Sequence, residues 1–206
     1  MNDLISKTGA AIVSVTVLLF ALFIILHFNF GSYLVCMFLP IGFVMTAAGF
    51  QNECSEDRKV AANIGLTLSA VYAVLILLVY YSQTTTVRLE ELNEHTIKVL
   101  DYQRGGLMFN YDLLGYGIMA LSTFFTGLSI EAKDKEDKWL KYLMMIHGIF
   151  FLSCFFMPMT GMFTSMSKGE HGSGGGIALL IWCIYFIPIG VLAFRHFDRT
   201  VIKENV

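Results

Sequence analysis

Six long apolar runs constrain the fold of this chain more than any other feature of its sequence. Each run has 20 or more residues, and most of the charged residues are gathered in short clusters outside these runs. A helix of about 20 apolar residues crosses a hydrocarbon core of about 30 Å. Backbone groups in lipid must satisfy their hydrogen bonds internally, so each run predicts a membrane-spanning helix. The predicted spans cover residues 8–28, 31–50, 60–82, 106–130, 140–163 and 175–194.

The composition agrees with a membrane protein rather than a soluble domain. Of the 206 residues, 56% are hydrophobic and only 15% are charged. We therefore expect an all-α polytopic protein in which residues 1–206 form a single integral membrane domain. Its expected partner is the lipid bilayer that surrounds it. The formal net charge of −2 and the lack of an extended basic block argue against a nucleic-acid partner. The first run is too long for the apolar part of a signal peptide, so we expect it to be a retained span.

The distribution of lysine and arginine predicts the orientation, because cytoplasmic loops carry an excess of both. If the N-terminus is cytoplasmic, the cytoplasmic segments hold ten such residues and the opposite segments hold four. The ten are Lys7, Arg58, Lys59, Lys133, Lys135, Lys138, Lys141, Arg195, Arg199 and Lys203, and the four are Arg88, Lys98, Arg104 and Lys168. We therefore predict a multi-pass protein of the cell membrane with both termini in the cytoplasm.

Two segments between the spans have distinctive patterns. Leu89, Leu92, Thr96 and Val99 follow helical spacing, and the charged residues around them lie mainly on other faces. Residues 87–100 are therefore predicted to form a short amphipathic helix on the outer membrane surface, between the third and fourth spans. The Gly-rich segment 167–176 is predicted to be a flexible outer link into the last span.

Asp112 is the only acidic residue that lies well inside an apolar run. With helical spacing it shares a face with four small, polar or flexible residues, Gly115, Met119, Ser122 and Thr126. Such a face packs against other helices or lines a cavity, because lipid offers it no hydrogen bonds. Asp112 is therefore predicted to point inward, where it serves a ligand, caps the first turn of its own helix or pairs with Arg104.

A group of polar and aromatic residues is predicted at the depth of Asp112. An intramembrane carboxylate needs a partner, and His27, Tyr80 and Gln83 are the groups expected at a comparable height. The predicted ligand-binding residues of a small outward-facing pocket are Asp112, His27, Tyr80, Gln83, Tyr111 and Trp182. His147 is predicted in the inner half of the fifth span, either as a neutral histidine between helices or as a proton relay.

No cofactor or metal site is predicted. The four cysteines form no CxxC motif, and Glu91 with His95 would supply only two metal ligands. His27 and His147 are expected near opposite sides of the membrane and cannot both bind one haem. HExxH and GxSxG motifs are absent, which disfavours an enzyme without excluding one.

Three functions follow, in order of preference. The first is a membrane protein that binds or transports a small solute or ion through the pocket centred on Asp112. The second is a non-transporting sensor or an assembly or immunity partner, and the third is an intramembrane enzyme acting on a lipid. The sequence leaves open both a homo-oligomer and a membrane partner protein.

Overall fold

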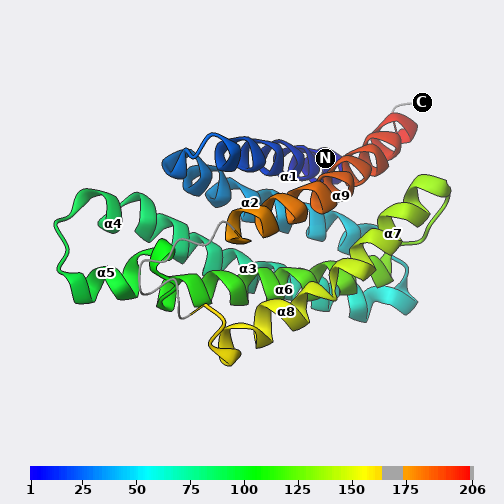
Figure 1. Cartoon of the computed structure of the whole chain (residues 1–206). Coiled ribbons are helices and arrows are strands. Elements are labelled where there is room, and N and C mark those ends of the chain that lie inside the picture. Colours follow the sequence, from blue (N-terminus) through cyan, green and yellow to red (C-terminus); the bar gives the residue numbers. More distant parts are fainter. Residues whose placement is uncertain (164–173, 205–206) are drawn as a thin grey trace.

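The computed structural model describes residues 1–163 and 174–204, and the part of the chain that it describes folds into helices without a strand. The longest helices lie side by side in one elongated bundle (Figure 1). We call one end the terminal end, because the first residues of α1 and the last residues of α9 both lie there, and the other end the α5 end. Most of the Gly-rich segment, and with it the predicted outer link, falls outside the described residues.

Helices α1 (Asn2–Ile25) and α2 (Asn29–Glu53) form a tight antiparallel hairpin. His27 turns the chain with a φ of 52°, in the left-handed region that residues other than glycine seldom adopt. Gly9 and Gly42 let the two backbones approach closely, since a Cβ on either would lie 2.8 Å from the carbonyl oxygen of the other.

Helices α3 (Lys59–Thr84) and α6 (Leu107–Ser129) form the second close pair. The Ser122 hydroxyl donates a 2.7 Å hydrogen bond to the Gly65 carbonyl oxygen across this contact. The whole predicted face of α6, from Asp112 through Gly115 and Ser122 to Thr126, is buried. The prediction that this face points inward is confirmed.

The predicted fifth span, 140–163, is not one continuous helix. It consists of α7 (Lys135–His147), α8 (Phe150–Phe156) and the short 3-10 helix η3 (Pro158–Thr160). The break after His147 coincides with Gly148, whose backbone lies so close to Phe124 that a Cβ there would be 2.8 Å from the Phe124 Cβ. The last helix, α9 (Gly174–Glu204), packs along α1 and α7.

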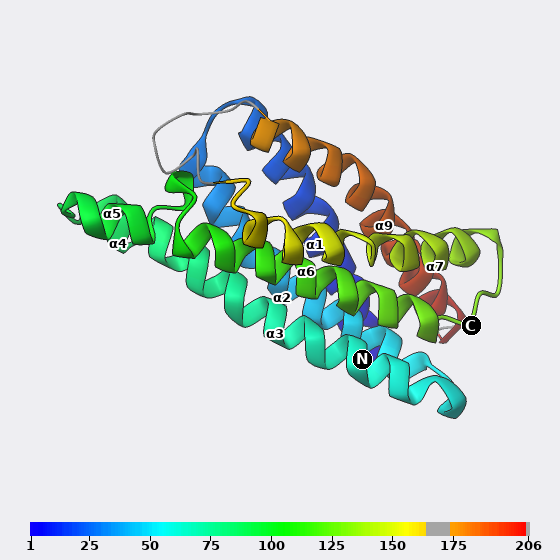
Figure 2. The same ribbon diagram turned by 60° about the horizontal axis from the view of Figure 1, so that its bottom comes forward.

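The predicted single helix over residues 87–100 is wrong. The chain forms α4 (Thr86–Leu89) and α5 (Glu94–Leu100), because extended backbone at Glu90 interrupts the helix and the Asn93 side chain caps a new one at the Thr96 amide. Figures 1 and 2 show that α4 and α5 extend from the bundle along the direction of α3 rather than lying across its end. The described residues also form the 3-10 helices η1 (Glu56–Arg58) and η2 (Tyr102–Arg104).

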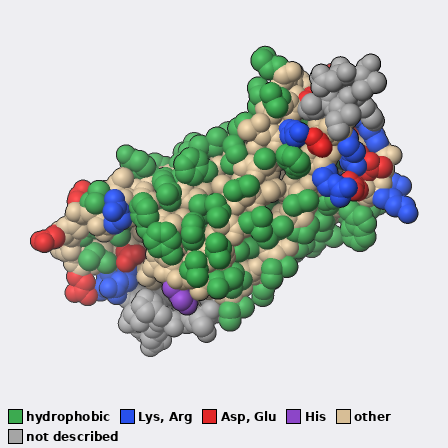
Figure 3. Space-filling view, turned by 90° about the horizontal axis from the view of Figure 1, so that it is seen from above, with side chains coloured by type: hydrophobic (Ala, Val, Ile, Leu, Met, Phe, Trp, Pro, Cys, Tyr) green, Lys and Arg blue, Asp and Glu red, His purple; other side chains and the backbone are tan. Residues whose placement is uncertain are grey.

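The surface pattern is that of an integral membrane protein. Hydrophobic side chains cover the middle of the visible face in Figure 3, and charged side chains gather at its two ends. Among the described residues, five helices rather than the predicted six are long and apolar enough to cross a membrane. Their bounds are Asn2–Ile25, Asn29–Glu53, Glu56–Leu89, Lys135–Thr160 and Gly176–Arg199. Helix α6 is not among the five, since Asn110, Asp112 and several glycine, serine and threonine residues lower its mean hydropathy.

Candidate functional site

Asp112 lies in the second turn of α6, near the α5 end, and its side chain is almost completely buried. Tyr80 on α3 and Tyr102 on η2 bring their hydroxyl groups close to its carboxyl group. One carboxyl oxygen, Oδ1, is buried without a hydrogen-bond partner among the described residues. The expected alternative partner, Arg104, instead lies 4.0 Å from the Asp101 carboxylate. Asp112 is therefore a buried carboxyl group that is only partly satisfied.

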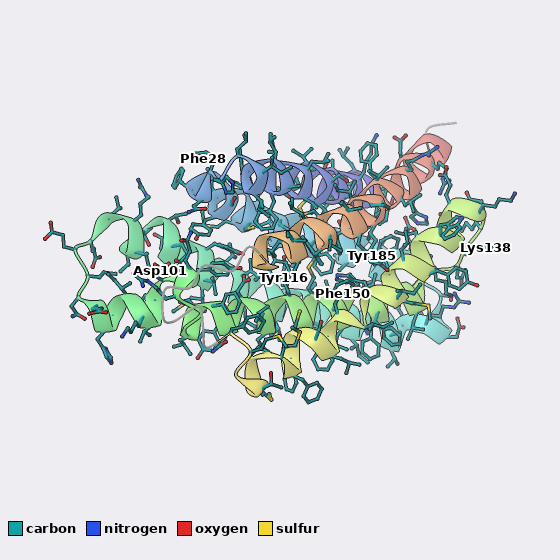
Figure 4. The ribbon with its side chains drawn as sticks, in the orientation of Figure 1. Phe28, Asp101, Tyr116, Lys138, Phe150 and Tyr185 are labelled. Carbon is teal, nitrogen blue, oxygen red and sulfur yellow. The ribbon has the colours of Figure 1, made fainter. Side chains whose placement is uncertain are left out.

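Aromatic side chains continue from this carboxyl group into the bundle. The rings of Tyr72 and Tyr116 are 5.8 Å apart, and the Tyr116 ring meets Trp182 edge-on at 5.1 Å. The Cys36 sulfur lies 3.9 Å from the Tyr116 hydroxyl. Figure 4 shows Tyr116 inside the bundle, while Asp101 lies at the α5 end. The described side chains beside the carboxyl group of Asp112 are thus phenols rather than charged groups, and an indole ring lies behind Tyr116.

Gln83 holds Tyr102 in this arrangement. Its amide nitrogen donates to the Leu100 carbonyl oxygen at 2.8 Å, and its amide oxygen accepts from the Tyr102 backbone N–H at 3.0 Å. The buried Gln83 side chain therefore fixes the loop that carries Tyr102 against α3. Burial raises the pKa of Tyr102 well above its ordinary range, so its hydroxyl keeps the proton that it can donate.

A pocket of about 260 Å³ lies at the α5 end, beside this cluster. It is lined by Asn29, Phe30, Tyr33, Gln83, Val87, Arg88, Asp101 and Gln103. Tyr33 connects the pocket with the buried carboxyl group, because its ring packs 5.7 Å from Tyr80 and 6.0 Å from Tyr102. The Gln103 side-chain amide donates a long, 3.4 Å hydrogen bond to the Tyr33 hydroxyl. The rings of Tyr33, Tyr80 and Tyr102 thus lie between the pocket and Asp112.

The six residues predicted to bind a ligand are not all brought together. Tyr80 lies beside Asp112, Gln83 reaches the site through Tyr102, and Trp182 lies behind Tyr116. His27 is exposed in the turn between α1 and α2, and Tyr111 is 41% exposed on another face of α6. The structure places neither His27 nor Tyr111 against the Asp112 carboxyl group.

His147 has a complete set of hydrogen bonds in the core. The Trp182 indole N–H donates to its Nε2 atom at 3.0 Å, so this nitrogen acts as the acceptor. Its Nδ1 atom lies 2.7 Å from the Thr123 hydroxyl, which in turn donates to the Ala120 carbonyl oxygen. These contacts fit a neutral ring with the proton on Nδ1. A neutral histidine that is hydrogen-bonded between helices explains these contacts, and they do not require a role as a proton relay.

Sequence reasoning missed Tyr102, Tyr116 and Cys36. One signal was available for Tyr116, which follows Asp112 by four residues and so shares its helical face. Tyr102 and Cys36 come from η2 and α2, and no local spacing relates them to α6.

A second polar cluster closes the terminal end, where it joins α2, α7 and α9. The ring nitrogens of His196 lie 2.9 Å from an Asp137 oxygen and 2.8 Å from a Glu53 oxygen. Arg199 binds the same Asp137 carboxylate at 2.7 Å. The cluster ties three helices together by charge at the end where the bundle meets its charged loops.

No group of three or more His, Cys, Asp or Glu residues within the described ranges could hold a metal ion. The chemistry offered at the α5 end is therefore that of one carboxyl group, several hydroxyl groups and a wall of aromatic rings. Comparison with known proteins adds no family to this description: no family model, curated protein sequence or solved structure matches the chain.

Proposed function

We propose that this chain is a six-span membrane protein that binds a small solute or ion at its α5 end and transports it. The observation that carries the proposal is the buried carboxyl group of Asp112, whose Oδ1 lacks a hydrogen-bond partner among the described residues and which tyrosine rings separate from a pocket of about 260 Å³. Ionisable residues inside membrane spans are costly, so their retention favours a functional role.

In this proposal α6 also crosses the membrane, which raises the number of spans from five to six. Its 23 residues would extend about 35 Å at 1.5 Å per residue, enough for a hydrocarbon core of about 30 Å. Its polar face packs against α3, α7 and α8, which spare Ser122, Thr126 and the glycines from contact with lipid. A central span needs less hydropathy than a peripheral one, because its neighbours rather than lipid surround it.

The orientation in this proposal follows the charges. Ten of the 14 lysine and arginine residues belong to segments at the terminal end, which we place in the cytoplasm. The α5 end, with its pocket and the α4–α5 extension, then faces outward. Solute would reach Asp112 from outside the cell.

A second candidate function is an interaction module. The α4–α5 extension projects beyond the helices of the bundle (Figure 2), and Leu89 in it is 66% exposed. An exposed apolar side chain on a projecting segment favours contact with a partner protein, or with another copy of the chain. This function would not depend on the charge of Asp112.

The test is the thermal stability of the purified protein with four small probes: methylammonium chloride, sodium acetate, glycine and urea. A ligand that binds the folded state at about 100 times its Kd adds about 2.7 kcal/mol of stability. At least one probe should raise the Tm of the parent by a few degrees, and Asp112→Asn should abolish that shift.

Asp112→Asn keeps the shape of the side chain, and its own free energy of unfolding should stay within about 1 kcal/mol of the parent. Asp57→Asn is the matched control, because Asp57 is an exposed carboxylate at the opposite end of the bundle. A shift that survives in Asp112→Asn, or no shift with any probe, would contradict the proposed function.

A further inference from the structure

We propose that the ligand of the Asp112 site is a small organic monocation of the alkylammonium class, and that it displaces a proton from the carboxyl group when it binds. This inference rests on the proposed function and specifies its ligand. Four features of the site support it: its charge, its rings, its small set of oxygen ligands and its access.

The charge of the site is uncompensated. The described groups that reach the Asp112 carboxyl group are neutral hydroxyls, those of Tyr80 and Tyr102. The arginines nearest the pocket have other contacts: Arg88 donates to the Thr84 carbonyl oxygen at 3.0 Å and lies 4.9 Å from the centre of the Phe30 ring. Arg104 lies beside Asp101. A buried carboxylate without a cationic partner is costly, so the site requires either a proton or a cationic ligand.

The walls of the site suit an organic cation. Tyr33 lies 5.7 Å from Tyr80, Tyr80 lies 6.1 Å from Tyr102, and Tyr116 extends the wall to Trp182. The faces of such rings attract ammonium groups through their quadrupoles, most strongly where water is excluded. The rings thus supply an attractive lining for the alkyl substituents as well as for the charge.

The same residues are poorly suited to a metal ion. Calcium takes about six to eight oxygen ligands, and magnesium requires a near-octahedral set. The described residues offer one carboxyl group and two phenols at this position, and no cluster of three His, Cys, Asp or Glu residues occurs in them. An ammonium group needs only a carboxylate and a few further hydrogen-bond acceptors.

Access leads through the pocket and past Tyr33. Asp101 and Arg88 both line the pocket, so its entrance carries side chains of both charges. The Tyr33 hydroxyl has a long contact of 3.4 Å with Gln103, so the hydrogen bond that breaks when this ring rotates is a weak one. A volume of about 260 Å³ fits a ligand of only a few non-hydrogen atoms.

Binding replaces the proton on the Asp112 carboxyl group with the ammonium group of the ligand. Before binding, the Asp112 carboxyl group carries a proton; as the ammonium group arrives, that proton leaves to solvent and a carboxylate–ammonium pair remains. The other titratable groups that interact with Asp112 are Tyr33 and Cys36 on α2, Tyr72 and Tyr80 on α3, Tyr102 on η2, Tyr116 on α6 and Cys154 on α8. Phenols and thiols of ordinary pKa, about 10 and about 8.5, stay neutral near pH 7 and leave Asp112 as the source of the proton.

The experiment is isothermal titration calorimetry of the purified protein with methylammonium chloride, in two buffers that differ in ionisation enthalpy. The buffer dependence of the heat should show the release of about one proton per ligand bound. The affinity should rise by up to about tenfold per pH unit between about pH 6 and about pH 8. Asp112→Asn should abolish binding, and Asp57→Asn should leave it unchanged.

Two ring variants test the aromatic lining. Tyr102→Phe keeps the ring and loses only the hydroxyl, whereas Tyr102→Leu loses both. Removal of the ring should weaken binding of tetramethylammonium by about 3- to 30-fold relative to Tyr102→Phe. Equal affinities in the two variants would overturn the role assigned to the rings.

The outcomes separate this inference from the proposed function. If sodium acetate or urea binds with dependence on Asp112 and methylammonium does not, the solute site survives and the cationic ligand is wrong. Binding of methylammonium without proton release would overturn the exchange. If none of the four probes binds, the inference and the proposed function fail together.

Discussion

Gln83 is the residue on which the position of Tyr102 depends. Gln83→Ala removes both hydrogen bonds of its side-chain amide and leaves the Tyr102 N–H and the Leu100 carbonyl group without that partner. The loss should cost about 1–3 kcal/mol of unfolding free energy. Hydrogen exchange at the Tyr102 amide should accelerate more than exchange in the middle of α6. Unchanged exchange at Tyr102 would show that Gln83 does not hold this loop.

His147 and Trp182 form a second pair that can be tested at this scale. His147→Phe leaves the Trp182 indole N–H without its acceptor in the core, which should cost about 1–3 kcal/mol. In the double variant with Trp182→Phe both partners are gone, so the combined loss of unfolding free energy should be smaller than the sum of the two single losses. Unfolding in mixed detergent micelles gives the four free energies. Strict additivity would mean that the hydrogen bond contributes nothing.

The sequence predicts the buried position of Asp112 but only part of its surroundings, since it places Tyr80 at this depth and misses Tyr102. Helical spacing was sufficient to place Asp112 on the buried face of α6, because that face is a local property of one helix. The approach of Tyr102 depends on the loop before α6, where Gly105 adopts a φ of 64° and Gly106 lies directly against the Lys98 carbonyl group. Side-chain spacing carries no information about such a turn. His27 was expected at the site from its depth alone, and depth does not determine which way a side chain points.

At the scale of elements, the close contact of α1 and α2 makes a sharp prediction. Gly42→Ala would place a Cβ 2.8 Å from the Gly9 carbonyl oxygen and 2.7 Å from the Ile12 Cγ2 atom. The two helices must move apart, which should lower the unfolding free energy by about 1–3 kcal/mol. Gly176→Ala is the control, since its Cβ would meet only Ile24 Cγ2, at 4.0 Å. Equal stability of the two variants would contradict the close packing of this hairpin.

The predicted helices differ from the observed ones where local caps and breaks intervene. Residues 87–100 have helical spacing throughout, yet Asn93 caps a separate helix and the extended Glu90 precedes it. An asparagine three residues before Thr96 is a readable capping signal, so this break could have been foreseen. The break between α7 and α8 could not, because it depends on the contact of Gly148 with Phe124 from α6.

At the scale of the whole molecule, the hydropathy and charge of the sequence predict which segments form long apolar helices and where the charged ends of the bundle lie. Five of the six apolar runs correspond to helices that are apolar enough to cross a membrane, and charged residues gather at the two ends of the bundle (Figure 3). The exception is the run that forms α6, whose buried face carries polar residues that lower its mean hydropathy. The charge cluster of His196, Glu53 and Asp137 escapes prediction, since its members come from three separate helices.

The central claim is that a membrane-embedded bundle opens its pocket outward while its terminal end faces the cytoplasm. Thiol labelling in intact cells tests it most directly. On a Cys54→Ser background the remaining cysteines, Cys36, Cys154 and Cys183, are buried or half-buried within helices. A single cysteine is then placed either in the pocket, as Gln103→Cys, or at the terminal end, as Glu56→Cys.

The measured quantity is labelling by a membrane-impermeant thiol reagent before and after permeabilisation of the cells. The account predicts that Gln103→Cys is labelled in intact cells and that Glu56→Cys is labelled only after permeabilisation. Labelling of Glu56→Cys in intact cells, with Gln103→Cys protected until the membrane is opened, would contradict it and place Asp112 on the cytoplasmic side.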